Sequence, residues 1–137
     1  MPIRIATIGV GHWHSLFDAA YLKTFARMPE VQLVGVQDDN AKLAEQRAAQ
    51  VGAPPVFSDY RKMLAETQPD FVLALGRPDT MAAVAHFLLD AGYPFLMEKP
   101  MGLNAREVRA ISDKAAGKTS FAGVPFFQRY HPFVAHA

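Results

Sequence analysis

Two short segments of this sequence combine residue types that could carry out chemistry. The first is an apolar run at 3–8 that ends in Gly9-Val10-Gly11, ahead of a segment with helical periodicity. In that context a Gly-x-Gly turn is typical of a pyrophosphate-binding loop, because the glycines let the backbone approach the phosphates and the next helix directs free N–H groups at the anion. The second is Glu98-Lys99-Pro100, which follows another apolar run. A lysine at such a strand end could donate a hydrogen bond to a substrate oxygen.

A third candidate, Asp38, follows the second predicted strand at 31–37. Its distance from the glycine turn is close to the ~20 residues at which dinucleotide-binding proteins place a ribose-binding acid. Asp39 stands beside it, and no arginine follows until Arg47. Because a 2′-phosphate would meet two carboxylates, we predict NAD as the cofactor in preference to NADP.

Each of these features has a plainer alternative. The glycine turn could be an ordinary strand-to-helix connection without a ligand, and Asp38 could be a helix-capping or solvated acid. Glu98 and Lys99 could form a surface ion pair. The third glycine of the G-x-G-x-x-G pattern is replaced by His14, so we expect the following helix to lie slightly further out.

Composition narrows the class of protein. The chain has 137 residues, half of them apolar, with a net charge of +1 and no cysteine. We expect one globular domain without disulfides, located in the cytoplasm. The mixed charges argue against nucleic acid, and apolar runs of strand length argue against a membrane span. His12 and His14 are two residues apart and no cysteine is present, so no metal site is predicted.

Strand-like and helix-like segments alternate along the chain, which predicts an α/β fold with a doubly wound parallel sheet, that is, a Rossmann fold. Right-handed crossovers give the strand order 3-2-1-4-5-6. We place strands at 3–8, 31–37, 56–57, 71–75, 95–97 and 120–124, and helices at 14–27, 41–51, 59–67, 78–91 and 104–116. Asn40 and Ser58 are the expected N-caps of the second and third helices.

The last residues differ in kind from the rest. We predict a dinucleotide-binding domain over 1–124 and an aromatic tail over 125–137 that begins a missing second domain. Large apolar side chains in that tail are expected to fold back or to join copies of the chain in a homo-oligomer; they are Phe126, Phe127, Tyr130 and Phe133.

Nearly the whole chain resembles the N-terminal domain of the glucose–fructose oxidoreductase and inositol dehydrogenase family. The resemblance lies in the glycine turn, in Asp38, and most specifically in the stretch 91–100, which reads A-G-Y-P-F-L-M-E-K-P. It implies an NAD(P)-binding Rossmann domain in which Lys99 is the catalytic-site lysine. It further implies that the cofactor is lined by Gly9, Gly11, His12, Asp38, Leu75, Arg77, Pro78, Glu98, Lys99 and Arg129.

The resemblance implies an oxidoreductase that transfers hydride between a nicotinamide and a hydroxyl or carbonyl carbon of a sugar, polyol or related molecule. The family's second α/β domain, which supplies the substrate pocket, is absent from this sequence, so we expect the isolated chain to be inactive. Two alternatives remain at this stage: a stand-alone dinucleotide-binding module without catalysis, and an assembly fragment that pairs through its aromatic tail.

Overall fold

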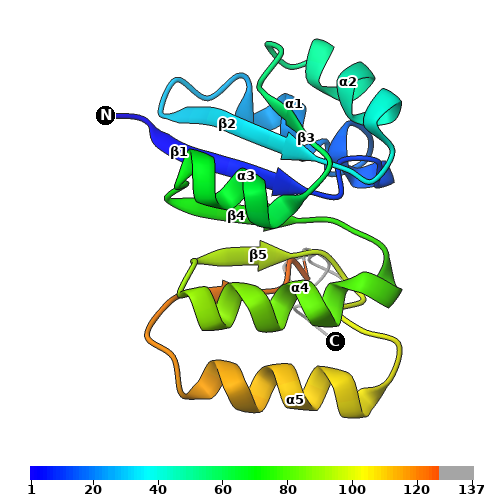
Figure 1. Cartoon of the computed structure of the whole chain (residues 1–137), viewed down its shortest axis with the longest axis vertical. Helices are drawn as coiled ribbons and strands as arrows, with labels where there is room; N and C mark the ends of the chain where they lie inside the picture. The colour runs from blue at the N-terminus through cyan, green and yellow to red at the C-terminus, as the bar shows by residue number, and fades with distance from the viewer. Residues whose placement is uncertain (127–137) are drawn as a thin grey trace, which may run out of the picture.

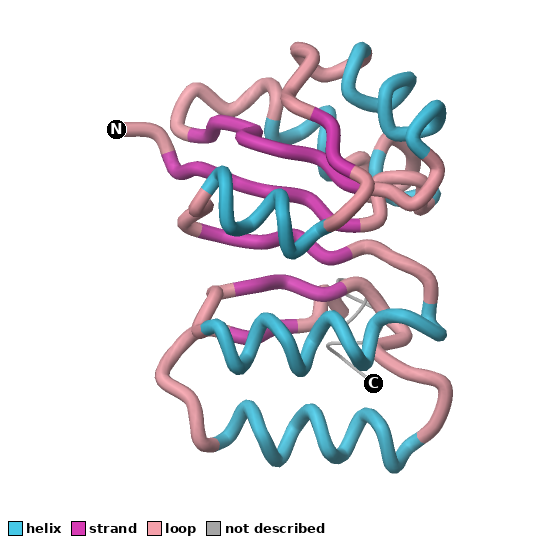
Figure 2. Tube along the Cα trace, in the orientation of Figure 1, coloured by secondary structure: helices cyan, strands magenta, loops and turns pink. Residues whose placement is uncertain are grey.

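The described part of the chain, residues 1–126 of a computed structural model, is built on a six-stranded parallel sheet (Figures 1 and 2). The strand order β3-β2-β1-β4-β5-β6 confirms the predicted Rossmann topology. The strands are β1 (Ile3–Ile8), β2 (Val31–Gln37), β3 (Val56–Phe57), β4 (Phe71–Ala74), β5 (Phe95–Met97) and β6 (Ala122–Gly123). The change of direction in this order lies between β1 and β4, where open α/β sheets bind ligands.

Helices cover both faces of the sheet, each over its own apolar core. The helices are α1 (Tyr21–Phe25), α2 (Ala41–Ala49), α3 (Tyr60–Thr67), α4 (Pro78–Ala91) and α5 (Ala105–Ala116), with a short 3-10 helix, η1 (Trp13–Ser15), before α1. Buried side chains of α3, α4 and α5 pack with β1, β4 and β5 in one cluster. Those of α1 and α2 pack with the end of β2 in the other. None of the helices within residues 1–126 is long and apolar enough to cross a membrane.

The first crossover is the main departure from the predicted elements. The helix expected at 14–27 is wrong: η1 is a single turn, and α1 begins only at Tyr21. Asp18 and Ala20 take left-handed backbone conformations (φ 52° and 46°), which interrupt a right-handed helix. Trp13 stabilises this turn by donating its indole N–H to Asp18 Oδ2 at 2.9 Å. The apolar spacing alone did not reveal the break, because Leu16 and Leu22 are both buried as a helix would require.

Helix caps explain most of the remaining boundaries. Asn40 caps α2 as predicted, accepting a hydrogen bond from the Leu43 amide. The cap of α3 is Asp59 rather than Ser58, and its carboxylate accepts from the Arg61 amide at 2.8 Å. The last strand, β6, has only two residues and is therefore shorter than the strand predicted at 120–124.

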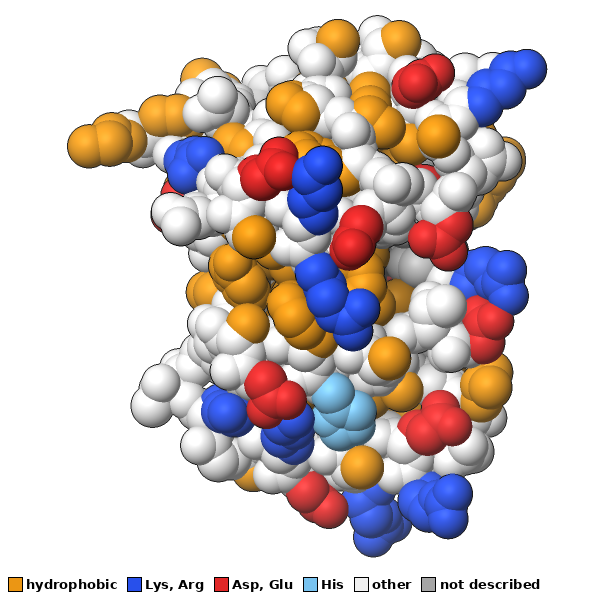
Figure 3. All heavy atoms as spheres, viewed as in Figure 1, with side chains coloured by type: hydrophobic (Ala, Val, Ile, Leu, Met, Phe, Trp, Pro, Cys, Tyr) orange, Lys and Arg blue, Asp and Glu red, His pale blue; other side chains and the backbone are white. Residues whose placement is uncertain are grey.

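Charged side chains are interspersed over the face shown in Figure 3, with acidic and basic groups side by side. Arg61 lies over the rings of Tyr60 and Phe87, with its guanidinium carbon 4.9 and 5.2 Å from the two centroids. Its aliphatic stem and planar head therefore cover part of the apolar surface between α3 and α4.

Met97 supports the segment that carries Glu98 and Lys99, because it is fully buried at the end of β5. We expect Met97→Ala to lower the free energy of unfolding by about 2–5 kcal/mol, as for other buried large-to-small changes. Chemical denaturation measures this loss. Met28→Ala is the control, because Met28 is exposed and its truncation should cost less than about 0.5 kcal/mol. Equal losses in the two variants would contradict the assigned burial.

Candidate functional site

The glycine loop after β1 is bound to the end of β2. The amides of Gly9 and Val10 both donate to the carbonyl oxygen of Gln37, at 2.8 and 3.0 Å. Gly9 has φ +71°, and a Cβ there would collide with the backbone of Gly76. Only glycine fits this position without displacing the chain after β4.

Gly11 is held by the predicted acid. Its amide donates to Asp38 Oδ2 at 2.7 Å, while Asp38 Oδ1 accepts from the Asn40 amide at 3.0 Å. A Cβ on Gly11 would lie 2.8 Å from both Asp38 Oδ2 and a Leu43 methyl carbon. A side chain at Gly11 would therefore push against the Asp38 carboxylate and the end of the Leu43 side chain.

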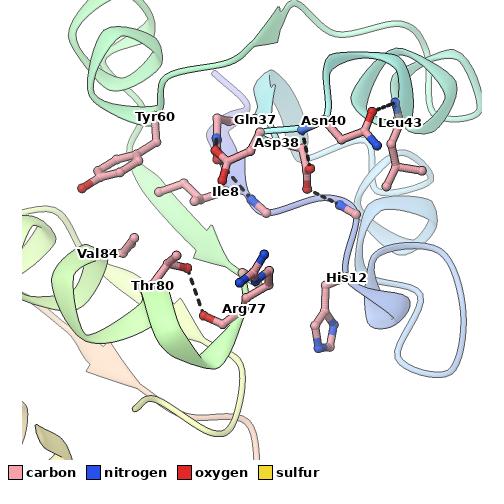
Figure 4. A pocket seen from close by; sticks show the side chains of 14 residues that line it. Ile8, His12, Gln37, Asp38, Asn40, Leu43, Tyr60, Arg77, Thr80 and Val84 are labelled. Carbon is pink, nitrogen blue, oxygen red and sulfur yellow. Dashed lines mark hydrogen bonds between the residues drawn. The ribbon is translucent and has the colours of Figure 1, made fainter. Parts of the chain in front are cut away.

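A pocket of about 500 Å³ opens between these two strand ends and the start of α4 (Figure 4). Its volume lies within the range of about 300–1,000 Å³ that is usual for small-molecule sites. Figure 4 shows Tyr60, Thr80 and Val84 at one side of the pocket and His12 at the other. Its lining comprises Ile8, Gly9, Gly11, His12, Gln37, Asp38, Asp39, Asn40, Leu43, Tyr60, Gly76, Arg77, Thr80 and Val84.

His12 contributes a neutral ring to the pocket. Burial is the main cause that lowers the pKa of His12, and the neighbouring His14 and Lys99 lower it further against the opposing effect of Glu98. Its Nδ1 accepts a hydrogen bond from the His14 amide at 3.2 Å, as an unprotonated nitrogen can. A neutral imidazole adds no positive charge for an anion.

Arg77 is the cationic side chain of the pocket lining. Its guanidinium donates through Nε and Nη2 to the carboxylate of Asp79, and this pair of hydrogen bonds raises the pKa of Arg77. The family resemblance placed Arg77 at the cofactor, whereas the count of arginines close to Asp38 in the sequence left it out, because Arg77 reaches the pocket from the turn between β4 and α4. The lining still carries two carboxylates, Asp38 and Asp39, against this one cation.

The helix expected to direct its amides at an anion is not formed behind the glycine loop. The His12 amide donates to Gly9 O and the Ser15 amide to His12 O, so these groups are used in turns. The expectation of an N-terminal helix site at this loop is therefore wrong, because the left-handed residues of the crossover shift α1 away along the chain.

Glu98 and Lys99 lie next to the pocket rather than in its lining. The Glu98 side chain is 2% exposed and that of Lys99 is 48% exposed, with 3.7 Å between Lys99 Nζ and Glu98 Oε1. The Tyr21 hydroxyl donates to Glu98 Oε2 at 3.0 Å, and His14 Nδ1 lies 3.4 Å from the same oxygen. The alternative of a surface ion pair therefore describes only Lys99, because the Glu98 carboxylate is buried.

Apart from Glu98 and Lys99, the predicted site residues fall into three groups. Five line the pocket: Gly9, Gly11, His12, Asp38 and Arg77. Leu75 is fully buried outside the pocket lining, and its amide donates to Ile8 O. Pro78 is an exposed residue at the first turn of α4. Arg129 and the aromatic residues from Phe127 onward lie outside the described residues; Phe126, the last one described, is exposed.

Gln37 is the site residue that sequence reasoning missed most clearly. It is 4% exposed, and its Oε1 accepts from the Gly9 amide while its Nε2 donates to Asp39 Oδ1 and to the Ser58 carbonyl. A glutamine at the end of the strand, directly before the predicted acid, was the available signal. Tyr60, Thr80 and Leu43 come from separate helices and gave no comparable signal.

Within residues 1–126, no group of three His, Asp or Glu side chains lies close enough together to hold a metal ion. The chemistry available at this site is therefore that of a polar loop, two carboxylates, an arginine and a nearby lysine. That set suits a ligand with hydroxyl groups and anionic groups.

Comparison with known proteins identifies the family. A family profile described as an oxidoreductase family with an NAD-binding Rossmann fold matches residues 3–126. The UDP-N-acetylglucosamine 3-dehydrogenase of Acidithiobacillus ferrooxidans is 30% identical over 134 residues, which cover 98% of this chain and 40% of that protein. The scyllo-inositol 2-dehydrogenase (NAD(+)) of Bacillus subtilis is 27% identical over 98% of this chain and 39% of its own length.

A solved structure shows the same fold. The myo-inositol dehydrogenase of Lactobacillus casei, in complex with NAD(H) and myo-inositol, superposes with a TM-score of 0.84 at 21% identity, covering 96% of this chain and 39% of that one. The chain thus spans about 40% of the length of the relatives it matches. It belongs to the glucose–fructose oxidoreductase and inositol dehydrogenase family of oxidoreductases, of which it represents the NAD-binding Rossmann domain.

Proposed function

We propose that this chain binds NAD in the pocket between β1, β2 and α4, as the nucleotide-binding part of an oxidoreductase. The observation that carries the proposal is the Gly11–Asp38 hydrogen bond at 2.7 Å, which fixes a carboxylate beside a glycine loop at the carboxyl edge of a parallel sheet. In doubly wound sheets this edge is where dinucleotides bind.

The residues present fit such a cofactor. Gly9 and Gly11 leave the loop without side chains, and the pocket extends from this loop to Tyr60 and Val84. Each oxygen of Asp38 accepts one backbone amide and keeps a further lone pair, with which it would accept hydrogen bonds from ribose hydroxyls. Arg77 would provide positive charge for the phosphates, and His12 would line the loop end.

Nicotinamide supplies hydride transfer when it is bound. Lys99 would hold or donate a proton at the substrate oxygen through its Nζ, which is accessible to solvent beside the pocket. Glu98 lies beneath it and would orient it. The names of the relatives favour a sugar or polyol as substrate, with the rest of the substrate site contributed by a further domain. A cytoplasmic location and self-association through the aromatic tail remain part of this proposal.

A binding module without catalysis remains the second candidate. Its support is that the described pocket accounts for cofactor binding by itself, whereas Lys99 faces outward.

Cofactor preference follows from the charges of the lining. We expect NAD to bind at least about tenfold more tightly than NADP, because the lining carboxylates repel a 2′-phosphate. Tenfold corresponds to about 1.4 kcal/mol, which lies between the roughly 1 kcal/mol in bulk water and 4 kcal/mol near a protein surface for two unit charges about 4 Å apart. Isothermal titration with both cofactors measures the ratio, and a preference for NADP would contradict it. Asp38→Ala should narrow the ratio, whereas Asp39→Ala should change it less, because Asp39 is exposed and is held by Gln37.

Gly11→Ala tests the loop. The new methyl group would push against the Asp38 carboxylate and Leu43, and it would break the charged hydrogen bond to the loop. We expect the NAD affinity to weaken by roughly 10- to 150-fold, which corresponds to the loss of about 1.5–3 kcal/mol that is estimated for a hydrogen bond to a charged group. Gly117→Ala is the matched control, because a Cβ there approaches nothing closer than 3.8 Å and should leave the affinity unchanged.

Lys99→Ala separates binding from chemistry. We expect the NAD dissociation constant of this chain to change by less than about twofold, because Lys99 lies outside the pocket lining. In a longer protein that carries this domain and turns over substrate, the same change should lower kcat by about 100-fold or more, the typical contribution of acid–base catalysis. Wild-type turnover in that variant would show that Lys99 has no chemical role.

A further inference from the structure

A small polar cluster lies beneath Lys99, formed by Tyr21, His14 and Glu98. The Glu98 side chain is 2% exposed, so its carboxylate is removed from bulk water and depends on protein groups for partners. The Tyr21 hydroxyl donates to Oε2 at 3.0 Å, and His14 Nδ1 lies 3.4 Å from that oxygen. In this cluster the two oxygens of one carboxylate have different surroundings.

The second oxygen faces the lysine. Glu98 Oε1 has no hydrogen-bond partner among the described residues, and Lys99 Nζ lies 3.7 Å from it. Burial is the main cause that raises the pKa of the Tyr21 hydroxyl, and the neighbouring Glu98 carboxylate raises it further. Tyr21 therefore keeps its proton and remains a donor to Oε2, which leaves Oε1 free to attract the ammonium group.

The partners of Glu98 come from a distant part of the chain. Tyr21 and Glu98 are separated by 77 positions, and both Tyr21 and His14 belong to the irregular crossover after the glycine loop. His14 occupies the position of the third glycine in the dinucleotide-binding pattern, and its amide donates to His12, which lines the pocket. Three successive contacts thus connect the pocket to the lysine: His12 with His14, His14 with Glu98, and Glu98 with Lys99.

We infer that Glu98 is a positioning residue for Lys99, and that Tyr21 and His14 hold the Glu98 carboxylate in the orientation this requires. The chemical consequence rests on the proposed function, in which Lys99 acts at the substrate oxygen. The positional claim does not, because it concerns the order of a side chain in the folded protein. In this arrangement the interrupted first crossover places Tyr21 and His14 against Glu98, the residue that follows β5.

A purely structural role of Tyr21 and His14 can be distinguished from a positioning role by the mobility of the Lys99 side chain. If Tyr21 and His14 only satisfied a buried acid, their loss would lower the unfolding temperature and leave the mobility of the lysine unchanged. If they position Glu98, their loss would release Lys99 in the protein that remains folded. The order of the Lys99 ammonium group is therefore the informative measurement.

The test uses NMR relaxation of the Nζ groups in the whole chain labelled with ¹⁵N-lysine. We expect Glu98→Gln and Tyr21→Phe each to lower the order parameter of Lys99 by about a third, the interval that separates rigid from flexible groups. Lys114 is an internal reference: its Nζ is held 2.6 Å from Asp90 Oδ2, an ion pair that none of these substitutions alters, so its order parameter should stay unchanged. Tyr93→Phe is the matched control, since the Tyr93 hydroxyl donates to Leu64 O at 3.2 Å.

Amide spectra identify which variants are folded. A folded Tyr21→Phe or Glu98→Gln in which Lys99 keeps its wild-type order would overturn the inference. If Tyr21→Phe does not fold, Glu98→Gln and His14→Gln decide the question by the same measurement. Adding NAD to the wild-type chain tests the proposed function separately: absence of any shift of the pocket amides would contradict NAD binding while leaving the positional result intact.

Discussion

The hydrogen bonds between the glycine loop and the end of β2 are the interaction on which the rest of the site depends. The Gln37 carbonyl accepts two loop amides, and Asp38 accepts a third at 2.7 Å. Each bond ties the loop of one strand to the neighbouring strand, so the sheet itself sets the loop geometry. Gly9 adds a second constraint, because its backbone passes against Gly76 at the end of β4. Three strand ends are therefore fixed together, and the pocket forms between them.

This constraint explains which features the sequence predicted well. Strand order, the glycine loop and Asp38 all follow from local patterns whose geometry the parallel sheet then enforces. Asn40 was recognisable because a capping residue acts on the backbone only three positions away. The family resemblance agreed with these patterns, and the match over residues 3–126 confirms it.

Features that depend on contacts between distant segments were not predictable in the same way. The interruption of the first crossover results from left-handed backbone at Asp18 and Ala20, residue types that also occur within helices. Arg77 was expected at the site only from the family resemblance, because it joins the pocket from the turn after β4. Gln37 acts through a side chain that sequence patterns treat as strand surface. The burial of Glu98 was equally hidden, because its partner Tyr21 is 77 positions away.

The broken crossover and the buried acid are two aspects of one arrangement. A continuous helix after the glycine loop would present its amides to an anion, which is the usual use of this position. Here the chain instead forms a short turn, and its His14 and Tyr21 approach the end of β5. In the proposed function, positive charge for a bound dinucleotide comes from a side chain instead, that of Arg77 in the pocket lining. The crossover therefore offers no helix N-terminus at the glycine loop, and its residues contact the Glu98 carboxylate beside Lys99 instead. Through His14, the same segment contacts both the proposed cofactor pocket and the acid next to the proposed reacting group.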